Sequence, residues 1–220
     1  MSFLLYGIVQ QDSVACPPGT CLITAHGLAA VVSAVEEMSS PPSVASLLAY
    51  EGVVEAIHAR QAVIPLRYGC VLENESAVLR FLEGHRQEYE AQLARFLGMT
   101  EMGIRVLWPE RAGVPPEFPP TPGGRYLASL RNRYPSAGTL GEEERQLADR
   151  IAGLLSGCST EQRREVAYSS QRRLLSLYFL TSQTGVERFR SKARSISPPS
   201  GAKVLVSGPW PPYNFVGSPE

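Results

Sequence analysis

The spacing of apolar residues in the first third of the chain predicts three strands of one sheet. The run Phe3–Val9 is apolar and rich in β-forming residues, and it is too short for a stable helix. We therefore expect it to be a central strand. Two further strands are predicted at Cys21–Thr24 and Leu28–Val35, on either side of a turn at His26 and Gly27.

Two later segments repeat their apolar residues every three or four positions, as a helix with one buried face does. The first is expected to begin after Ser43, which has the side chain of a good N-cap, and to cover a sheet. Its apolar positions are Val44, Leu47, Leu48, Val54 and Ile57. The second is expected as one long helix that Asn74 caps and Gly98 stops. Its apolar face comprises Val78, Phe81, Leu82, His85, Tyr89, Leu93, Phe96 and Leu97.

The second half of the chain alternates strand and helix patterns in a recognisable order. Strands are predicted at 103–108, 164–168, 174–180 and 203–207, with helices at 141–155 and 186–193. The order is strand, helix, strand, strand, helix, strand, which is the split βαβ arrangement of ferredoxin-like domains. We therefore predict an α+β protein of two domains, an N-terminal α+β domain at 1–98 and a C-terminal ferredoxin-like (βαββαβ) domain at 99–220.

Proline determines the character of two further segments. Residues 109–122 contain six prolines and are predicted as a loop inserted in the second domain, followed by a helix at 126–134. The run 207–215 combines three prolines with three aromatic residues, and we expect a fixed, extended tail because proline removes backbone donors and locks φ. Its aromatic side chains are costly to leave in water, so the tail must pack onto something.

The composition limits the range of functions. Hydrophobic residues make up 44% of the 220 residues and charged residues 19%, which is ordinary globular usage, and the formal net charge is zero. No long-range field draws the protein to nucleic acid or to an anionic membrane, so neither partner is expected. No apolar run approaches a membrane span and the start lacks the features of a signal peptide, so we expect a cytoplasmic protein.

The sequence offers little chemistry for an active site. The four cysteines and three histidines lie at spacings unsuited to zinc, so no metal or other cofactor is expected. Gly123 and Gly124 lack the Lys-Ser/Thr of a phosphate-binding loop. Cys70 lies in no catalytic signature and is interpreted as a small buried side chain. We predict that the protein is not an enzyme and has no catalytic residues.

Four residues are candidates for contact with a partner protein: Arg67, Trp210, Tyr213 and Phe215. Arg67 lies in the strand-like run Val63–Leu72, where its guanidinium either recognises a partner or forms an internal ion pair that ties the strand to a helix. The internal ion pair is the favoured alternative. Of the aromatic residues, Trp210 is expected to pack inside the protein, and Phe215 is the best candidate for a partner contact.

Three motifs in this order resemble the F/L-type gas-vesicle proteins: Phe-Leu-Leu-Tyr-Gly-Ile-Val at 3–9, Pro-Leu-Arg-Tyr-Gly at 65–69 before a long amphipathic helix, and Gly-Pro-Trp-Pro-Pro-Tyr-Asn-Phe at 208–215. The resemblance implies two α+β domains, the second ferredoxin-like. It also implies a non-catalytic accessory component of the gas vesicle that binds the hydrophobic shell-forming subunit and assists nucleation or assembly, with other accessory gas vesicle proteins as further partners. Preventing aggregation of that subunit is one way to assist.

The chain departs from the family pattern in two places. Cys70 stands where a small hydroxyl residue is more usual, and the region between Gly157 and Arg173 is short and rich in arginine. Two alternatives also stay open. Ferredoxin-like sheets often bind ligands, which would make the protein a small-molecule sensor or regulatory module, and an enzyme with an unrecognised site is the third hypothesis.

Overall fold

The structure is a computed structural model of the chain, and it describes residues 1–13, 16–36, 42–109, 141–169, 172–198 and 200–217. These form two compact units. Unit 1 comprises Met1–Glu101 together with Pro209–Glu220, and unit 2 comprises Met102–Gly208. The end of the chain therefore groups with unit 1, whereas the sequence analysis assigned it to the domain at 99–220. The domain boundary at 98 stays a prediction.

Unit 1 is built on a five-stranded sheet in which β1 (Ser2–Gln10) is central, as predicted. β1 pairs antiparallel with β3 (Leu28–Val35), which in turn pairs with β2 (Cys21–Ala25). On its other side β1 pairs with two short strands, β4 (Ile64–Pro65) and β5 (Val71–Leu72).

Two local features shape this sheet. The predicted turn between β2 and β3 is confirmed, because His26 and Gly27 have φ values of 52° and 83°, as a two-residue hairpin turn requires. The second feature is the close approach of β4 to Gly7. A Cβ atom there would lie 2.6 Å from the Val63 side chain and 2.9 Å from the Ile64 carbonyl oxygen, so β4 can pair at this point only with glycine.

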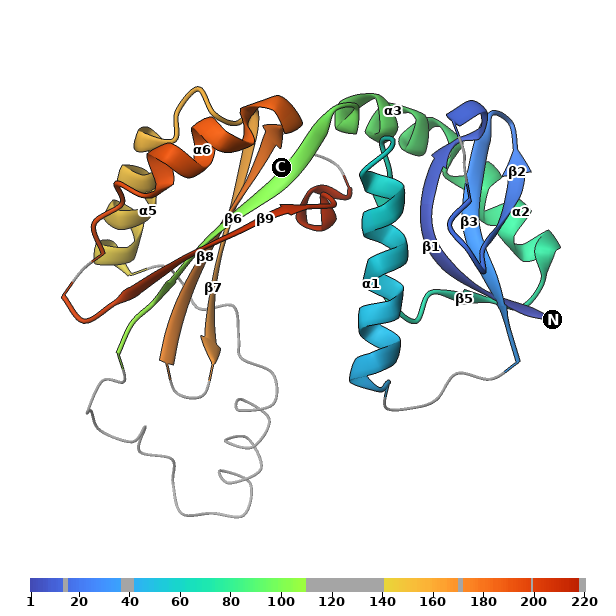
Figure 1. The fold of residues 1–220 in the computed structure, drawn as a ribbon, viewed down its shortest axis with the longest axis horizontal. Helices are drawn as coiled ribbons and strands as arrows, with labels where there is room; N and C mark the ends of the chain where they lie inside the picture. The colour runs from blue at the N-terminus through green and yellow to red at the C-terminus, as the bar shows by residue number, and fades with distance from the viewer. Residues whose placement is uncertain (14–15, 37–41, 110–140, 170–171, 199, 218–220) are drawn as a thin grey trace, which may run out of the picture. The chain divides into compact units, whose positions relative to one another are not determined.

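Helices cover both faces of this sheet: α1 (Val44–His58) lies on one face and α2 (Glu75–Gly84) on the other (Figure 1). The predicted caps are confirmed, since the Ser43 and Asn74 side chains accept hydrogen bonds from the backbone N–H groups of Ser46 and Ala77, at 3.0 and 2.9 Å. 

The prediction of a single long helix after Asn74 is wrong. The segment forms two helices, α2 and α3 (Arg86–Phe96), because the backbone of His85 leaves the helical region at φ −118° and ψ 14°. His85 and Leu97, which were assigned to the buried face, are exposed. The predicted end of the helical segment at Gly98 is confirmed, since Gly98 has a φ of 68°, which favours glycine.

The strand predicted at Val63–Leu72 is also wrong over most of its length. Only β4 and β5 pair with β1, and the residues between them form a loop. In that loop the N–H of Cys70 donates to the carbonyl of Arg67 at 3.3 Å, and Gly69 has a φ of 96°. A positive φ at this position turns the chain away from the sheet.

Unit 2 holds a four-stranded sheet in the order β7-β8-β6-β9. Its strands are β6 (Met99–Leu107), β7 (Glu161–Ser169), β8 (Arg172–Ser182) and β9 (Lys203–Trp210). The helices α5 (Glu142–Leu154) and α6 (Val186–Ala193) pack on one face (Figure 1). The buried core between them includes Met102, Ile104, Val106, Leu147, Ile151, Leu175, Phe179 and Phe189.

The chain is thus an α+β protein with two antiparallel sheets, as predicted. The ferredoxin-like assignment of the second domain stays a prediction. Single turns of 3-10 helix occur at Gln11–Ser13, Gln183–Gly185 and Tyr213–Phe215. The helix predicted at 126–134 and the proline-rich loop, apart from Pro109, lie outside the described residues.

Candidate interaction site

The tail, defined here as Pro209–Gly217, is fixed to unit 1 by side chains that bind its backbone. The carboxylate of Glu101 accepts from both the backbone N–H and the side-chain amide of Asn214, at 2.8 and 2.6 Å. Glu101 is only 4% exposed, so these hydrogen bonds replace the water molecules that the carboxylate loses on burial.

Two further side chains bind carbonyl groups of the tail. The Thr100 hydroxyl donates to the carbonyl of Trp210 at 2.9 Å. The Arg95 guanidinium donates to the carbonyls of Phe215 and, at 3.2 Å, of Gly217. A segment with so few backbone donors of its own is thereby held along its length by polar groups of unit 1.

The burial of the tail aromatics reverses the expectation for two candidates. Phe215, expected to contact a partner, is fully buried, whereas Trp210, expected inside the protein, is 43% exposed. The reason is the turn at Tyr213–Phe215: the N–H of Phe215 donates to the carbonyl of Pro212 at 3.1 Å. The turn directs the chain back into the core, so Phe215 is not available to a partner in this conformation.

Four tyrosines of unit 1, here called the tyrosine cluster, bring the motifs of the sequence together: Tyr6, Tyr50, Tyr68 and Tyr213. The ring of Tyr50 stacks on Tyr6 at a centroid distance of 4.8 Å and meets Tyr68 edge to face at 5.3 Å. Tyr213 packs against the same buried residues. The opening strand, the Pro-Leu-Arg-Tyr-Gly loop and the tail thus all contact α1 at Tyr50.

The hydroxyl of Tyr50 ties two of these segments together. Its single proton is shared between the carbonyl oxygens of Leu5, at 2.8 Å, and Leu66, at 2.9 Å. Burial strongly raises the pKa of Tyr50, with smaller contributions from Tyr213, Cys70 and Tyr6, so the group stays a neutral donor. The cluster therefore acts as a hydrogen-bonded support for the fold.

Two carboxylates border the cluster. Glu51 and Glu55 are exposed on α1, and they form no ion pair with any residue that the structure describes. Burial, and next the charges of these two acids, raise the pKa of Tyr213 to about 12. The rim of the cluster therefore carries negative charge.

The first half of α1 does not cover the sheet as the sequence analysis expected. Val44 is 72% exposed, Leu48 63% and Leu47 36%. Burial begins only at Tyr50 and continues through Val54, Ile57 and His58. Three of the five apolar positions assigned to the buried face are therefore on the surface, where they form an apolar patch.

Arg67 is exposed at the loop beside Tyr68. The favoured alternative, an internal ion pair, is not formed within the described ranges of the chain. Of the four predicted candidates, Tyr213 lies in the tyrosine cluster and Arg67 follows Leu66, whose carbonyl the cluster binds. The backbone carbonyl of Trp210 accepts a hydrogen bond from Thr100, and Phe215 is buried.

Sequence reasoning missed the anchors of the tail, Arg95, Thr100 and Glu101. A signal was present in the sequence, since Glu101 is an acid within the largely apolar run that forms β6. An acid in such a position needs a specific partner. Its partner lies 113 residues away in the sequence, and no local pattern points to it.

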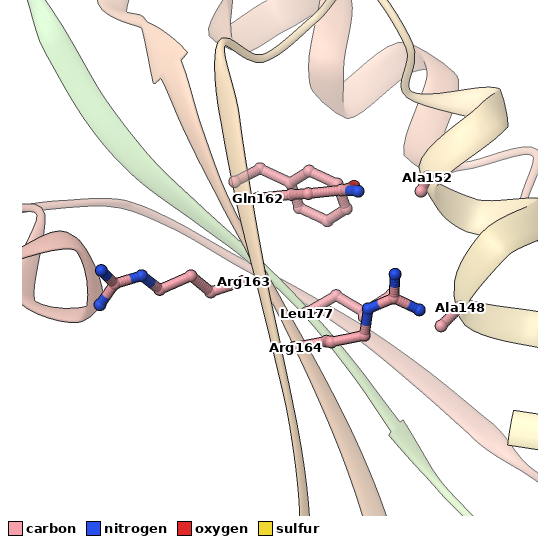
Figure 2. Close-up of a pocket in the computed structure, with 7 residues that line it drawn as sticks. Ala148, Ala152, Gln162, Arg163, Arg164 and Leu177 are labelled. Atoms are coloured by element: carbon pink, nitrogen blue, oxygen red, sulfur yellow. The ribbon is translucent and has the colours of Figure 1, made fainter. Parts of the chain in front are cut away.

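A pocket in unit 2 offers little room for a ligand (Figure 2). It encloses about 10 Å³, enough for roughly one water molecule. Figure 2 shows Gln162 and Arg164 extending toward α5 and Arg163 pointing away from it. Arg164 is paired with Asp149 at 3.0 Å. The lining residues are Ala148, Ala152, Gln162, Arg163, Arg164, Leu177 and Phe179.

The cysteines and the acidic and histidine side chains were the remaining candidates for reactive or metal-binding groups; Cys16 and Cys21 are exposed and Cys158 is buried. All four cysteines are free, and burial raises the pKa of Cys70, which keeps its thiol protonated and weakly nucleophilic. Among the described residues, no cluster of three or more His, Cys, Asp or Glu side chains is placed to hold a metal ion. Likewise, no described helix is long and apolar enough to cross a membrane.

The fold is that of an α+β protein with two antiparallel sheets, and in unit 1 the opening strand, the loop after β4 and the tail pack together through aromatic rings. The family model "Gas vesicle synthesis protein GvpL/GvpF" matches residues 2–217, and the chain belongs to this family.

Individual relatives and solved structures agree with the family match. The chain is 26% identical to gas vesicle protein F of a Streptomyces species over 98% of this chain and 100% of that protein. It is 24% identical to gas vesicle protein F2 of Halobacterium salinarum, over 96% and 90%. Its fold matches the crystal structure of GvpF from Microcystis aeruginosa with a TM-score of 0.73, at 15% identity and 99% coverage of both chains.

Proposed function

We propose that the protein is a non-catalytic accessory component of gas vesicle assembly that binds the hydrophobic shell-forming subunit and assists nucleation of the vesicle. In this role it keeps an aggregation-prone subunit in solution until the shell takes it up. Other accessory gas vesicle proteins are its further partners, and it acts in the cytoplasm at the growing vesicle.

The observation that carries this proposal is the apolar patch of α1, on a chain that belongs to a gas vesicle synthesis family. Contiguous exposed apolar residues on a protein are typical of binding surfaces.

We also propose the ferredoxin-like assignment for unit 2. The described elements follow one another as β6, α5, β7, β8, α6 and β9, and the sheet order β7-β8-β6-β9 supports the assignment. A sensor role for this unit has less support, because the pocket of Figure 2 holds about one water molecule.

Co-expression with the shell subunit tests the proposed function. Affinity-tagged protein is expected to co-purify that subunit in soluble form, and the subunit expressed alone is expected to aggregate. Deleting the gene should reduce the number of vesicles or change their shape. Normal vesicles after deletion, together with no complex in the co-purification, would contradict the proposal.

A further inference from the structure

The outer face of α1 between Val44 and Glu55 is an apolar surface that the described contacts leave without a partner. We propose that this face, which comprises Val44, Leu47, Leu48, Glu51 and Glu55, binds an amphipathic helix whose apolar stripe is flanked by Lys or Arg. The inference deepens the proposed function by naming a surface and the chemistry of the partner, and it rests on that function only in assuming that the protein acts by binding.

The composition of α1 is the first argument. Of its 15 residues, only Glu51, Glu55 and His58 are of the acidic or basic types, so the helix is apolar on nearly all sides. A helix of this kind is normally buried all round. Here only one side is buried, at Tyr50, Val54 and Ile57, and the opposite apolar side lies in solvent.

The geometry of this face suits a helix in particular. Val44, Leu47 and Leu48 follow the three- and four-residue steps that form a ridge along a helix. Beside the ridge, Ala45, Ala49 and Gly52 are exposed and small. A Cβ atom added at Gly52 would meet nothing within 4 Å, so another backbone has room to approach closely.

The charge of this face indicates which charge the partner should carry. The face ends in two carboxylates that no described cation neutralises, and α1 itself contains no Lys or Arg. Negative charge at the rim of an apolar surface favours a partner with positive charge beside its apolar stripe. A second copy of the chain fits less well, because pairing two such faces would combine four carboxylates with no cation from either α1.

Fluorescence anisotropy of two labelled peptides with the full-length protein tests the inference. Both peptides are ~18-residue amphipathic helices with the same leucine stripe, one flanked by lysine and the other by glutamate. The lysine peptide is expected to bind more tightly, and Leu48→Asp should weaken its binding at least about tenfold. Reversing the charge of the face with Glu51→Lys and Glu55→Lys should make the glutamate peptide the tighter binder.

Leu205→Asp is the matched control, because Leu205 is similarly exposed, at 57%, but lies on β9. It should leave peptide binding unchanged. Circular dichroism verifies that each variant is folded, and Val44→Asp replaces Leu48→Asp if the latter unfolds. Equal binding of the two peptides, or an equal loss in Leu205→Asp, would overturn the inference.

Two further outcomes separate this inference from the proposed function. If the protein forms a dimer that Leu48→Asp dissociates, the face binds a second copy and the inference is wrong. If Leu48→Asp and Val44→Asp still co-purify the shell subunit as well as the parent protein does, the proposed function stands and this surface is not the one used.

Discussion

The tail and the first half of α1 are both largely apolar, but they lie in opposite environments. Both are short, apolar segments of unit 1, yet Phe215 is fully buried while Val44 and Leu48 are largely exposed. The difference lies in polar anchoring. Arg95, Thr100 and Glu101 hold the tail by its backbone and side chains, and no such contact fixes the outer face of α1 among the described residues. We therefore expect the tail to stabilise the protein, and the outer face of α1 to be the binding surface proposed above.

The largest effect is expected from Phe215→Ala. Removing a fully buried aromatic ring leaves a cavity and should lower the free energy of unfolding by about 3–5 kcal/mol, measured by urea denaturation. Trp210→Ala is the control, and because Trp210 is 43% exposed its loss should be less than half as large. Equal losses of stability in the two variants would contradict the conclusion that Phe215 is buried in the core while Trp210 is partly exposed.

Glu101→Gln is expected to come next. It replaces a buried carboxylate that accepts two hydrogen bonds from Asn214, and the free energy of unfolding should fall by about 1.5–3 kcal/mol. Glu90→Gln serves as the matched control, since Glu90 forms an exposed ion pair with Arg86 that is worth about 0–1 kcal/mol. Thermal denaturation compares the two, and no difference between them would show that Glu101 does not anchor the tail.

His58 links α1 to the tail anchor and should make stability depend on pH. The Thr100 hydroxyl has one proton, which it donates to Trp210, so it accepts from Nε2 of His58 at 3.2 Å. The other ring nitrogen is buried without a partner in the described structure. A second proton would therefore create a buried cation, and burial lowers the pKa of His58 from its ordinary 6.5.

The direction of the change in stability with pH follows from how many protons the folded and unfolded states bind. Below about pH 6.5 the unfolded chain binds a proton that the folded protein does not, so stability falls as the pH falls toward the folded pKa, by at most about 1.4 kcal/mol per pH unit. Urea denaturation between pH 7.5 and pH 5, at roughly half-unit steps, measures this slope. His58→Gln keeps a donor to Thr100 and should reduce this slope. An unchanged slope would mean that other groups cause the pH dependence of stability.

The smallest effect on stability is expected from Leu48→Asp. Leu48 is 63% exposed, so the free energy of unfolding should change by no more than about 0.5 kcal/mol. Thermal denaturation checks this result against Leu93→Asp, a change of the same kind at a position that is 1% exposed on α3. A comparable loss in both variants would mean that the α1 face is part of the core.

Local patterns predicted most of the elements and missed the contacts that give them their roles. The strand β1, the His26-Gly27 turn and the caps at Ser43 and Asn74 depend on neighbouring residues, and each was predictable. Periodicity alone gave no warning that the helix breaks at His85, where the apolar spacing continues through the break.

The candidate site was less predictable because it is assembled from distant segments. Tyr213 was a candidate from its motif, but the buried cluster against which it packs is made of residues far from it in the sequence. The burial of Phe215 was not predictable either, because it depends on the turn at Tyr213–Phe215. The exposure of Leu48 was missed because a helical pattern identifies an apolar face without saying what covers it.

The most direct test of this account is the amount of shell subunit that Leu48→Asp co-purifies at a matched concentration of folded protein. If the outer face of α1 binds the subunit, the captured amount should fall by at least about tenfold while the melting temperature stays at that of the parent protein. Full capture by Leu48→Asp would contradict the claim that the exposed face of α1, rather than the anchored tail, is the binding surface.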